Sequence, residues 1–189
     1  LGRGAKRLNA LELAQRQDRL FILGKPGAGK TTFLKYLTLQ ALHQKIDKIP
    51  IFISLHEWAN SGKGLMDFVV QQFEICAFPD AQAFIEYLLN KGWALALFDG
   101  LDEVNVEGDR RAKITTDINN FVKQYPKNKH LITCRIAASD YLFHGFTTVE
   151  VVDFDQSQIE TFVGKWFGDE PDKGARFLEE LKKDEHRGL

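Results

Sequence analysis

Short apolar segments alternate along the chain with longer stretches in which apolar residues recur every three or four positions. The short segments predict buried strands, because a strand covered on both faces can be apolar at every position. They are residues 20–23, 49–55, 93–98, 130–134 and 147–152. The longer stretches predict helices. They are the stretch that starts at Phe33 and residues 65–77, 81–90, 110–125, 155–167 and 173–183.

The alternation of strands and helices predicts an α/β fold, a doubly wound, parallel five-stranded sheet with helices on both faces. Ligands of such sheets bind beyond the carboxyl ends of the strands. Residues 1–18 form a lead-in segment with leucines at helical spacing, and residues 19–189 form one domain. The first residue is Leu1 and not Met, so we expect this domain to be part of a longer chain.

The segment after the first strand has the complete pattern of a phosphate-binding loop, G-x-x-x-x-G-K-[ST]. Its nucleotide-binding residues are Gly24, Lys25, Pro26, Gly27, Ala28, Gly29, Lys30, Thr31 and Thr32. Glycines let the backbone turn tightly, and successive N–H groups can then surround a phosphate at a helix N-terminus. Lys30 adds positive charge for the β- and γ-phosphates of ATP or ADP, and the Thr31 hydroxyl can bind Mg²⁺. The alternative is a glycine-rich turn that binds nothing.

A second motif follows the third predicted strand, where four apolar residues lead into Asp-Gly-Leu-Asp-Glu at residues 99–103. This is the form of a Walker B strand, in which Asp99 holds Mg²⁺ beside Thr31. Asp102 and Glu103 lie just beyond the strand, where either can orient or deprotonate an attacking water. The alternatives are a strand-end turn for Asp99 and ordinary loop acids for the other two.

Arg135 follows the fourth predicted strand, at the edge where phosphates are expected, and it can sense a γ-phosphate. The alternative is a surface arginine that pairs with a neighbouring acid. We expect Arg110 and Arg111 to lie on the solvated first turn of a helix, after a cap at Asp109. The strand at 49–55 lies between the two motif-bearing strands in the sequence. This order indicates an inserted central strand, as in P-loop ATPases with a catalytic acid, and argues against a small GTPase.

Composition narrows the setting of this site. The chain has 189 residues and a formal net charge of −1, so no global basic field points to nucleic acid. No apolar run approaches a membrane span. Cys76 and Cys134 are expected to be reduced thiols in the core, which favours a cytoplasmic protein.

These motifs resemble those of the NACHT family, a branch of the signal-transducing (STAND) P-loop ATPases. The resemblance covers residues 19–167 and is carried by the phosphate loop, by Leu-Phe-Asp-Gly-Leu-Asp-Glu-Val and by Ile-Thr-Cys-Arg at the fourth strand. Many members have Ser-Arg-Pro where this chain has Cys134-Arg135-Ile136, which keeps the arginine and alters the loop after it. The resemblance implies a slow regulatory ATPase. ADP would hold a closed monomer, and ATP would permit self-association and switch an attached effector.

Three functions stay open on the sequence: a signalling switch, a P-loop small-molecule kinase, and a nucleotide-dependent interaction module without turnover. A kinase would need a second substrate pocket and an arginine-bearing lid, and the sequence offers neither. Lys30, Thr31, Asp99 and Glu103 argue against an inactive module. Of the expected catalytic residues (Lys30, Asp102, Glu103 and Arg135), Glu103 is favoured over Asp102 for water activation.

Overall fold

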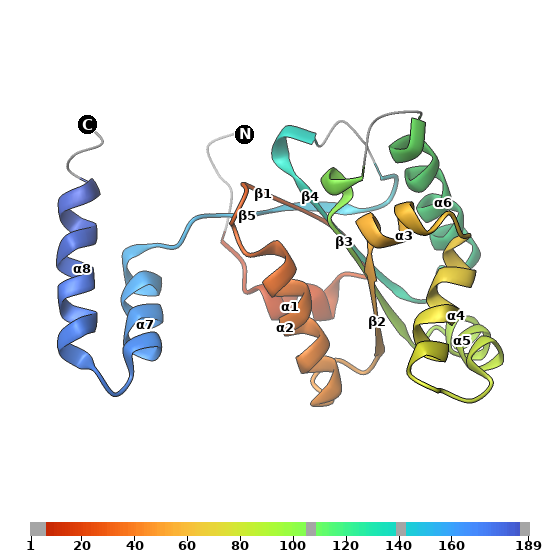
Figure 1. Cartoon of the computed structure of the whole chain (residues 1–189), viewed down its shortest axis with the longest axis horizontal. Helices are drawn as coiled ribbons and strands as arrows, with labels where there is room; N and C mark the ends of the chain where they lie inside the picture. Colours follow the sequence, from red (N-terminus) through yellow and green to blue (C-terminus); the bar gives the residue numbers. More distant parts are fainter. Residues whose placement is uncertain (1–6, 105–108, 139–142, 186–189) are drawn as a thin grey trace. The chain divides into compact units, whose positions relative to one another are not determined.

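The computed structural model describes residues 7–104, 109–138 and 143–185 (Figure 1). The chain divides into two compact units, Leu1–Val151 and Val152–Leu189. Among the helices of the described residues, none is long and apolar enough to cross a bilayer.

In its described residues, the first unit contains a sheet, the helices that cover it, and the short 3-10 turns η1 and η3. Its elements in chain order are α1 (Ala10–Arg16), β1 (Arg19–Gly24), α2 (Lys30–Leu42), β2 (Ile49–Ser54), α3 (Leu55–Ser61), α4 (Leu65–Ile75), α5 (Ala81–Lys91), β3 (Ala94–Asp99), η1 (Leu101–Glu103), α6 (Arg110–Gln124), β4 (Lys129–Arg135), η3 (Ile136–Ala138) and β5 (Thr147–Val151).

All pairings in the sheet are parallel, and the strand order is β2-β3-β4-β1-β5. The predicted five-stranded parallel α/β sheet is therefore confirmed. An inserted central strand is also present, and it is β4, which lies between β1 and β3. The strand that separates them in the sequence, β2, lies at the edge of the sheet.

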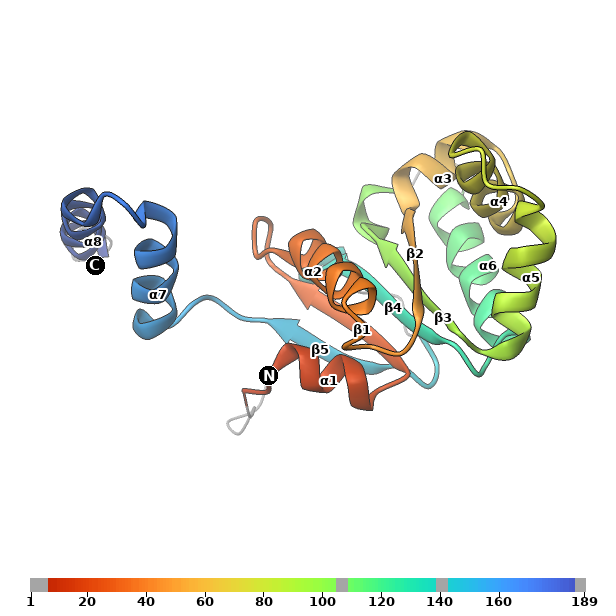
Figure 2. The ribbon, with the colours of Figure 1, turned by 90° about the horizontal axis from the view of Figure 1, so that it is seen from below.

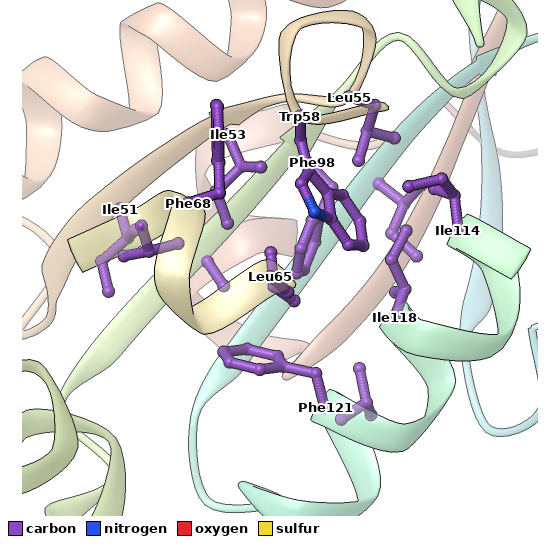
Figure 3. Close-up of a cluster of buried hydrophobic side chains, with 14 of the residues drawn as sticks. Ile51, Ile53, Leu55, Trp58, Leu65, Phe68, Phe98, Ile114, Ile118 and Phe121 are labelled. Atoms are coloured by element: carbon purple, nitrogen blue, oxygen red, sulfur yellow. The ribbon is translucent and has the colours of Figure 1, made fainter. Parts of the chain in front are cut away.

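Helices cover both faces of the sheet, as Figure 2 shows. Alternate strand residues point to opposite faces, so each face has its own core. On one face, Leu20, Leu95 and Leu131 pack with residues of α1 and α2. On the other, aromatic and aliphatic side chains of α3–α6 pack against Phe98 and its neighbours (Figure 3).

Helix α3 was not expected from the sequence, where the second strand was predicted to run to residue 55. The strand ends at Ser54, and its side chain accepts a hydrogen bond from the Glu57 N–H (3.3 Å) as the N-cap of α3. The sequence Ser-Leu-His-Glu contains the S-x-x-E pattern of a helix start. The helix buries Trp58 in the core, where Figure 3 shows its ring beside Phe98.

Two further expectations were wrong. Asp109 is the N-cap residue of α6, but its backbone is left-handed (φ 57°) and its side chain makes no capping bond. Cys76 is exposed at the C-cap of α4, so only Cys134 is a buried thiol; the two do not form a disulfide.

A buried lysine ties α1 to the central strand β4. The Lys129 ammonium donates to the Gln15 and Gln17 carbonyls (3.0 and 2.9 Å) and to Asp18 Oδ1 (3.0 Å). Its side chain is only 9% exposed, so these three acceptors replace the water that an ammonium ordinarily binds.

The second unit is a pair of helices, α7 (Gln156–Phe167) and α8 (Pro171–Glu185). Asp155 starts α7 with a capping box, in which its side chain and that of Gln158 each bond the other's backbone N–H. In the predicted apolar face of α7, Val163 is buried and faces Gly174 of α8, and the Phe162 and Trp166 rings stack 5.7 Å apart.

Candidate functional site

The carboxyl ends of three neighbouring strands carry the residues that the sequence singled out. Gly24 ends β1, Asp99 ends β3 and Arg135 ends β4. Gly24 and Arg135 are partners in the parallel register, and β3 pairs with β4 on its other side. The structure therefore places the phosphate loop, the acidic segment and the arginine at one edge of the sheet.

The phosphate loop owes its shape to its glycines. Gly27 and Gly29 have left-handed backbones (φ 76° and 86°), and an added Cβ at either would meet nothing within 4 Å. Glycine is needed there for backbone conformation and leaves the inner side open for a ligand. Gly24 is packed more tightly, since a Cβ would lie 3.3 Å from those of Ala28 and Val151.

The loop leads directly into α2, whose first residues are Lys30, Thr31 and Thr32. Gly29 is the N-cap and no side chain caps this helix start, so its first N–H groups suit an anion. The Lys30 ammonium donates to the Gly24 and Lys25 carbonyls, at 3.0 Å each. The Lys30 ammonium is thus held by the same loop that is expected to bind the nucleotide phosphates.

Asp99 is oriented by a hydroxyl from the neighbouring strand. Thr133 on β4 donates to Asp99 Oδ1 (2.6 Å) and accepts the Gly100 N–H (2.8 Å). Thr133 is completely buried. Sequence reasoning treated it only as part of a strand, although a polar residue inside a buried strand must find a hydrogen-bond partner.

Gly100 begins the acidic turn in a left-handed conformation (φ 79°). A Cβ at this position would lie 3.0 Å from Glu103 Cδ and Oε2, so the Glu103 carboxylate leans over Gly100. The Glu103 side chain is exposed, and Leu101 is buried beneath the turn. Within this turn, Glu103 is therefore the acid that solvent can reach.

Asp102 is used differently from Glu103. Its carboxylate accepts the Arg135 backbone N–H (Oδ1, 2.8 Å) and pairs with Arg135 Nε (Oδ2, 2.8 Å). The Asp102 side chain is 7% exposed and that of Arg135 is 50% exposed. The pairing considered in the sequence analysis as an alternative is thus present, and it fixes Arg135 at the strand end.

The sequence led us to expect Arg111 on the solvated first turn of a helix, and this expectation is wrong. Arg111 is half-buried, and its guanidinium donates to the Asp102 carbonyl (2.9 Å) and twice to the Val104 carbonyl (3.2 and 2.9 Å). Arg110 is exposed, as expected. Arg111 therefore secures the backbone of the acidic turn from α6, a role that no local sequence signal predicts.

Cys134 precedes Arg135 and stays protonated at neutral pH. Burial, reinforced by the negative charge of Asp102, raises the pKa of this thiol to about 11. The buried thiol therefore acts as an apolar side chain beneath the site and not as a nucleophile.

The donor groups at this edge fit a nucleotide with a divalent cation. Backbone N–H groups and an ammonium suit phosphates, while the Thr31 hydroxyl and the Asp99 carboxylate are the oxygen ligands that Mg²⁺ prefers. The open inner side of Gly27 and Gly29 gives a polyphosphate room to approach the backbone.

The sequence matches a family model described as the NACHT domain over residues 18–170. No curated protein matches the chain.

Solved structures with a similar fold include AMPPCP-bound DnaA from Aquifex aeolicus (TM-score 0.52, 18% identity, 85% of this chain and 48% of that one). Domain III of DnaA from Thermotoga maritima gives a TM-score of 0.53 at 18% identity, over 85% of this chain and 67% of that one. A third similar structure is a Signal Transduction ATPase with Numerous Domains (STAND) protein from Pyrococcus horikoshii, which has a tetratricopeptide repeat sensor. Its TM-score is 0.50 at 15% sequence identity, over 93% of this chain and 27% of that one. At these identities the likeness is one of fold. This chain spans about half of the Aquifex protein and about a quarter of the Pyrococcus protein.

Proposed function

This chain belongs to the NACHT family and is a nucleotide-binding P-loop NTPase domain, and we propose that it binds ATP with Mg²⁺ and hydrolyses it slowly to switch assembly of an attached effector. The observation that carries the proposal is the placement of the ends of β1, β3 and β4 side by side. One edge of the sheet thereby offers groups for phosphate, metal and water.

Phosphate binding falls to the loop N–H groups, the start of α2 and Lys30. The ammonium now bonds the Gly24 and Lys25 carbonyls, so engaging a phosphate means exchanging neutral acceptors for an anionic one. Hydrogen bonds between ionised partners are shorter and stronger than those to neutral acceptors, which favours the exchange.

The metal would be held by Thr31 and Asp99, and a bound Mg²⁺ supplies positive charge that neutralises the phosphates and the leaving oxygen. The roles of the protein are to supply oxygen ligands and to keep the Asp99 carboxylate in one orientation. The Thr133 hydroxyl at 2.6 Å performs the second role.

Water activation is assigned to Glu103. A general base needs an accessible carboxylate with a lone pair for the proton. Asp102 Oδ1 accepts the Arg135 backbone N–H, Oδ2 pairs with Arg135 Nε, and the Asp102 side chain is buried. Glu103 is exposed beside Gly100, so it meets the requirement better.

Arg135 is assigned to the γ-phosphate. Its backbone and Nε are fixed by Asp102, while half of the side chain is exposed at the strand end that pairs with Gly24. An arginine that contacts only the γ-phosphate would favour ATP over ADP, and a ligand shifts a conformational equilibrium only through such a difference. Self-association in the ATP state and a cytoplasmic setting are part of the same proposal and rest on the family.

The test is calorimetric titration of this chain with ATP and Mg²⁺, followed by steady-state hydrolysis and nucleotide exchange. Lys30→Ala should weaken ATP binding by about 10- to 150-fold, because it removes a charge-assisted contact of about 1.5–3 kcal/mol. Lys35→Ala makes the same change of charge at an exposed position of α2 and should bind like wild type.

Equal ATP affinity in Lys30→Ala and wild type would remove the phosphate loop from the proposal. Binding without turnover in the wild type would favour an interaction module. Transfer of phosphate to a small acceptor, in place of water, would favour a kinase.

A further inference from the structure

The Thr133 hydroxyl links three parts of the edge that the proposed function uses separately. It lies on β4, bonds the carboxylate that ends β3, and bonds the first peptide of the acidic turn. Its side chain is fully buried between these elements. A hydroxyl has one proton to donate and two lone pairs with which to accept, and this one uses both abilities on Asp99 and Gly100.

The direction of each bond follows from chemistry. The Gly100 N–H can only donate, so Thr133 Oγ1 is its acceptor at 2.8 Å. The hydroxyl proton is then directed to Asp99 Oδ1 at 2.6 Å, within the range of O–H···O⁻ bonds to an ionised carboxylate. The arrangement therefore holds the Asp99 carboxylate through one of its two oxygens.

We propose that Thr133 is a positioning residue for the metal-binding carboxylate, which orients Asp99 for the nucleotide-bound divalent cation; this rests on the proposed function. With Oδ1 held by Thr133, the carboxylate keeps further lone pairs that could bind a cation. Mg²⁺ demands near-ideal octahedral geometry, so a carboxylate held in one orientation binds it better than a rotating one. Groups that orient metal ligands typically change metal affinity or activity by about 10- to 100-fold when they are removed.

The same hydroxyl also acts on the acidic turn. The Gly100 peptide that it fixes carries the left-handed φ of 79°, which turns the chain from β3 into η1. Glu103 leans over this glycine. Thr133 thus couples the position of the metal-binding acid to that of the water-activating acid, and its loss should affect both.

The experiment compares wild type with Thr133→Val and Thr133→Ser, measuring ATP binding and turnover across a Mg²⁺ titration and ATP binding in EDTA. Valine keeps the shape without the hydroxyl, and serine restores the hydroxyl. Thr133→Val should raise the half-saturating Mg²⁺ concentration about 10- to 100-fold and leave ATP affinity in EDTA unchanged. Thr133→Ser should return the Mg²⁺ dependence to near the wild-type curve.

Thr38→Val is the matched control, because it removes a helix hydroxyl whose bond is to the Leu34 carbonyl of its own helix α2. It should leave the Mg²⁺ curve in place. If Thr133→Val does not fold, Thr133→Cys keeps the volume with a weak donor and should show the same shift.

An unchanged Mg²⁺ curve in a folded Thr133→Val or Thr133→Cys variant overturns the positioning role. So does an equal loss of ATP affinity with and without Mg²⁺, which a purely structural hydroxyl would produce. Absence of Mg²⁺-dependent ATP binding in the wild type would instead defeat the proposed function itself, so the two failures are distinguishable.

Discussion

The phosphate loop (residues 24–32) and the acid loop (residues 99–103) lie at the same edge of one sheet, yet they are held in different ways. Inside the phosphate loop, Lys30 bonds carbonyls five and six residues away, and the Ala28 N–H bonds the Lys25 carbonyl. The acid loop also has local backbone bonds and contacts from Arg111. Its two aspartates, however, are held by Thr133 and Arg135, which lie 33 or 34 residues from their partners. A motif that is held by its own residues can be recognised in full from the sequence. For a motif that is held by other strands, the sequence shows the acidic residues but not the residues that hold them.

The comparison predicts that the two acids of the acid loop are not interchangeable. Glu103→Gln should lower single-turnover hydrolysis by about 10²–10⁴-fold and leave ATP affinity near the wild-type value, because a general base is not needed for binding. Asp102→Asn should act mainly through Arg135, by weakening their ion pair. It should therefore reduce the preference for ATP over ADP more than Glu103→Gln does.

The measurements are rapid-quench hydrolysis and paired ATPγS and ADP affinities for both variants. Glu103→Asp is a useful companion, because it keeps the charge and withdraws the carboxylate. If Asp102→Asn abolished turnover and Glu103→Gln did not, the roles assigned to the two acids would be reversed.

Low pH should lower the stability of the fold at β4, the strand that supports the acid loop. Burial lowers the pKa of His130 on β4 from 6.5 to about 4, despite its hydrogen bond to the Tyr125 carbonyl (3.0 Å). Between these values the unfolded chain binds a proton that the folded chain does not. The contribution of neutral His130 to the free energy of unfolding is therefore fully present above pH 6.5. It falls by up to about 3 kcal/mol as the pH drops towards 4.

Urea unfolding from pH 7 to 4 checks this expectation, with His130→Gln as the variant that cannot take up the proton. The difference between wild type and variant should narrow as pH falls, because only the wild type loses this contribution. The exposed His43, changed to Gln, is the control and should follow the wild-type pH dependence. Parallel curves for wild type and His130→Gln would contradict the expectation.

The smallest expected effect separates two adjacent arginines. Arg111→Ala should destabilise the fold by about 1–3 kcal/mol, since it leaves the partly buried carbonyls of Asp102 and Val104 without their donor. Arg110→Ala should stay within about 0.5 kcal/mol of wild type, as for most exposed positions. Urea unfolding measures both, and equal effects would show that the Arg111 contacts contribute nothing.

Alternation of apolar strands and amphipathic helices was enough to predict the parallel α/β sheet. A strand that is buried on both faces is apolar at nearly every position, and this pattern can be recognised directly in the sequence. The phosphate loop was legible for the same kind of reason, since glycines with positive φ and a lysine at fixed spacing are local requirements. Asp109 shows the limit: its residue type predicts a cap, but its left-handed backbone keeps the side chain from capping. Arg111 and Thr133 are ordinary in sequence and acquire their contacts only when α6 and β4 fold beside β3.

Lys129 carries a consequence for where the folded unit can be cut. Its buried ammonium depends on Gln15, Gln17 and Asp18, which all precede the first strand. A truncated chain that began at Arg19 would keep every strand and every motif. It would, however, leave the buried Lys129 ammonium without its three acceptors. Leaving a buried charge without its partners costs about 3–5 kcal/mol, a large part of the stability of a typical domain. We therefore expect a fragment that begins at Arg19 to be less stable than one that keeps residues 15–18.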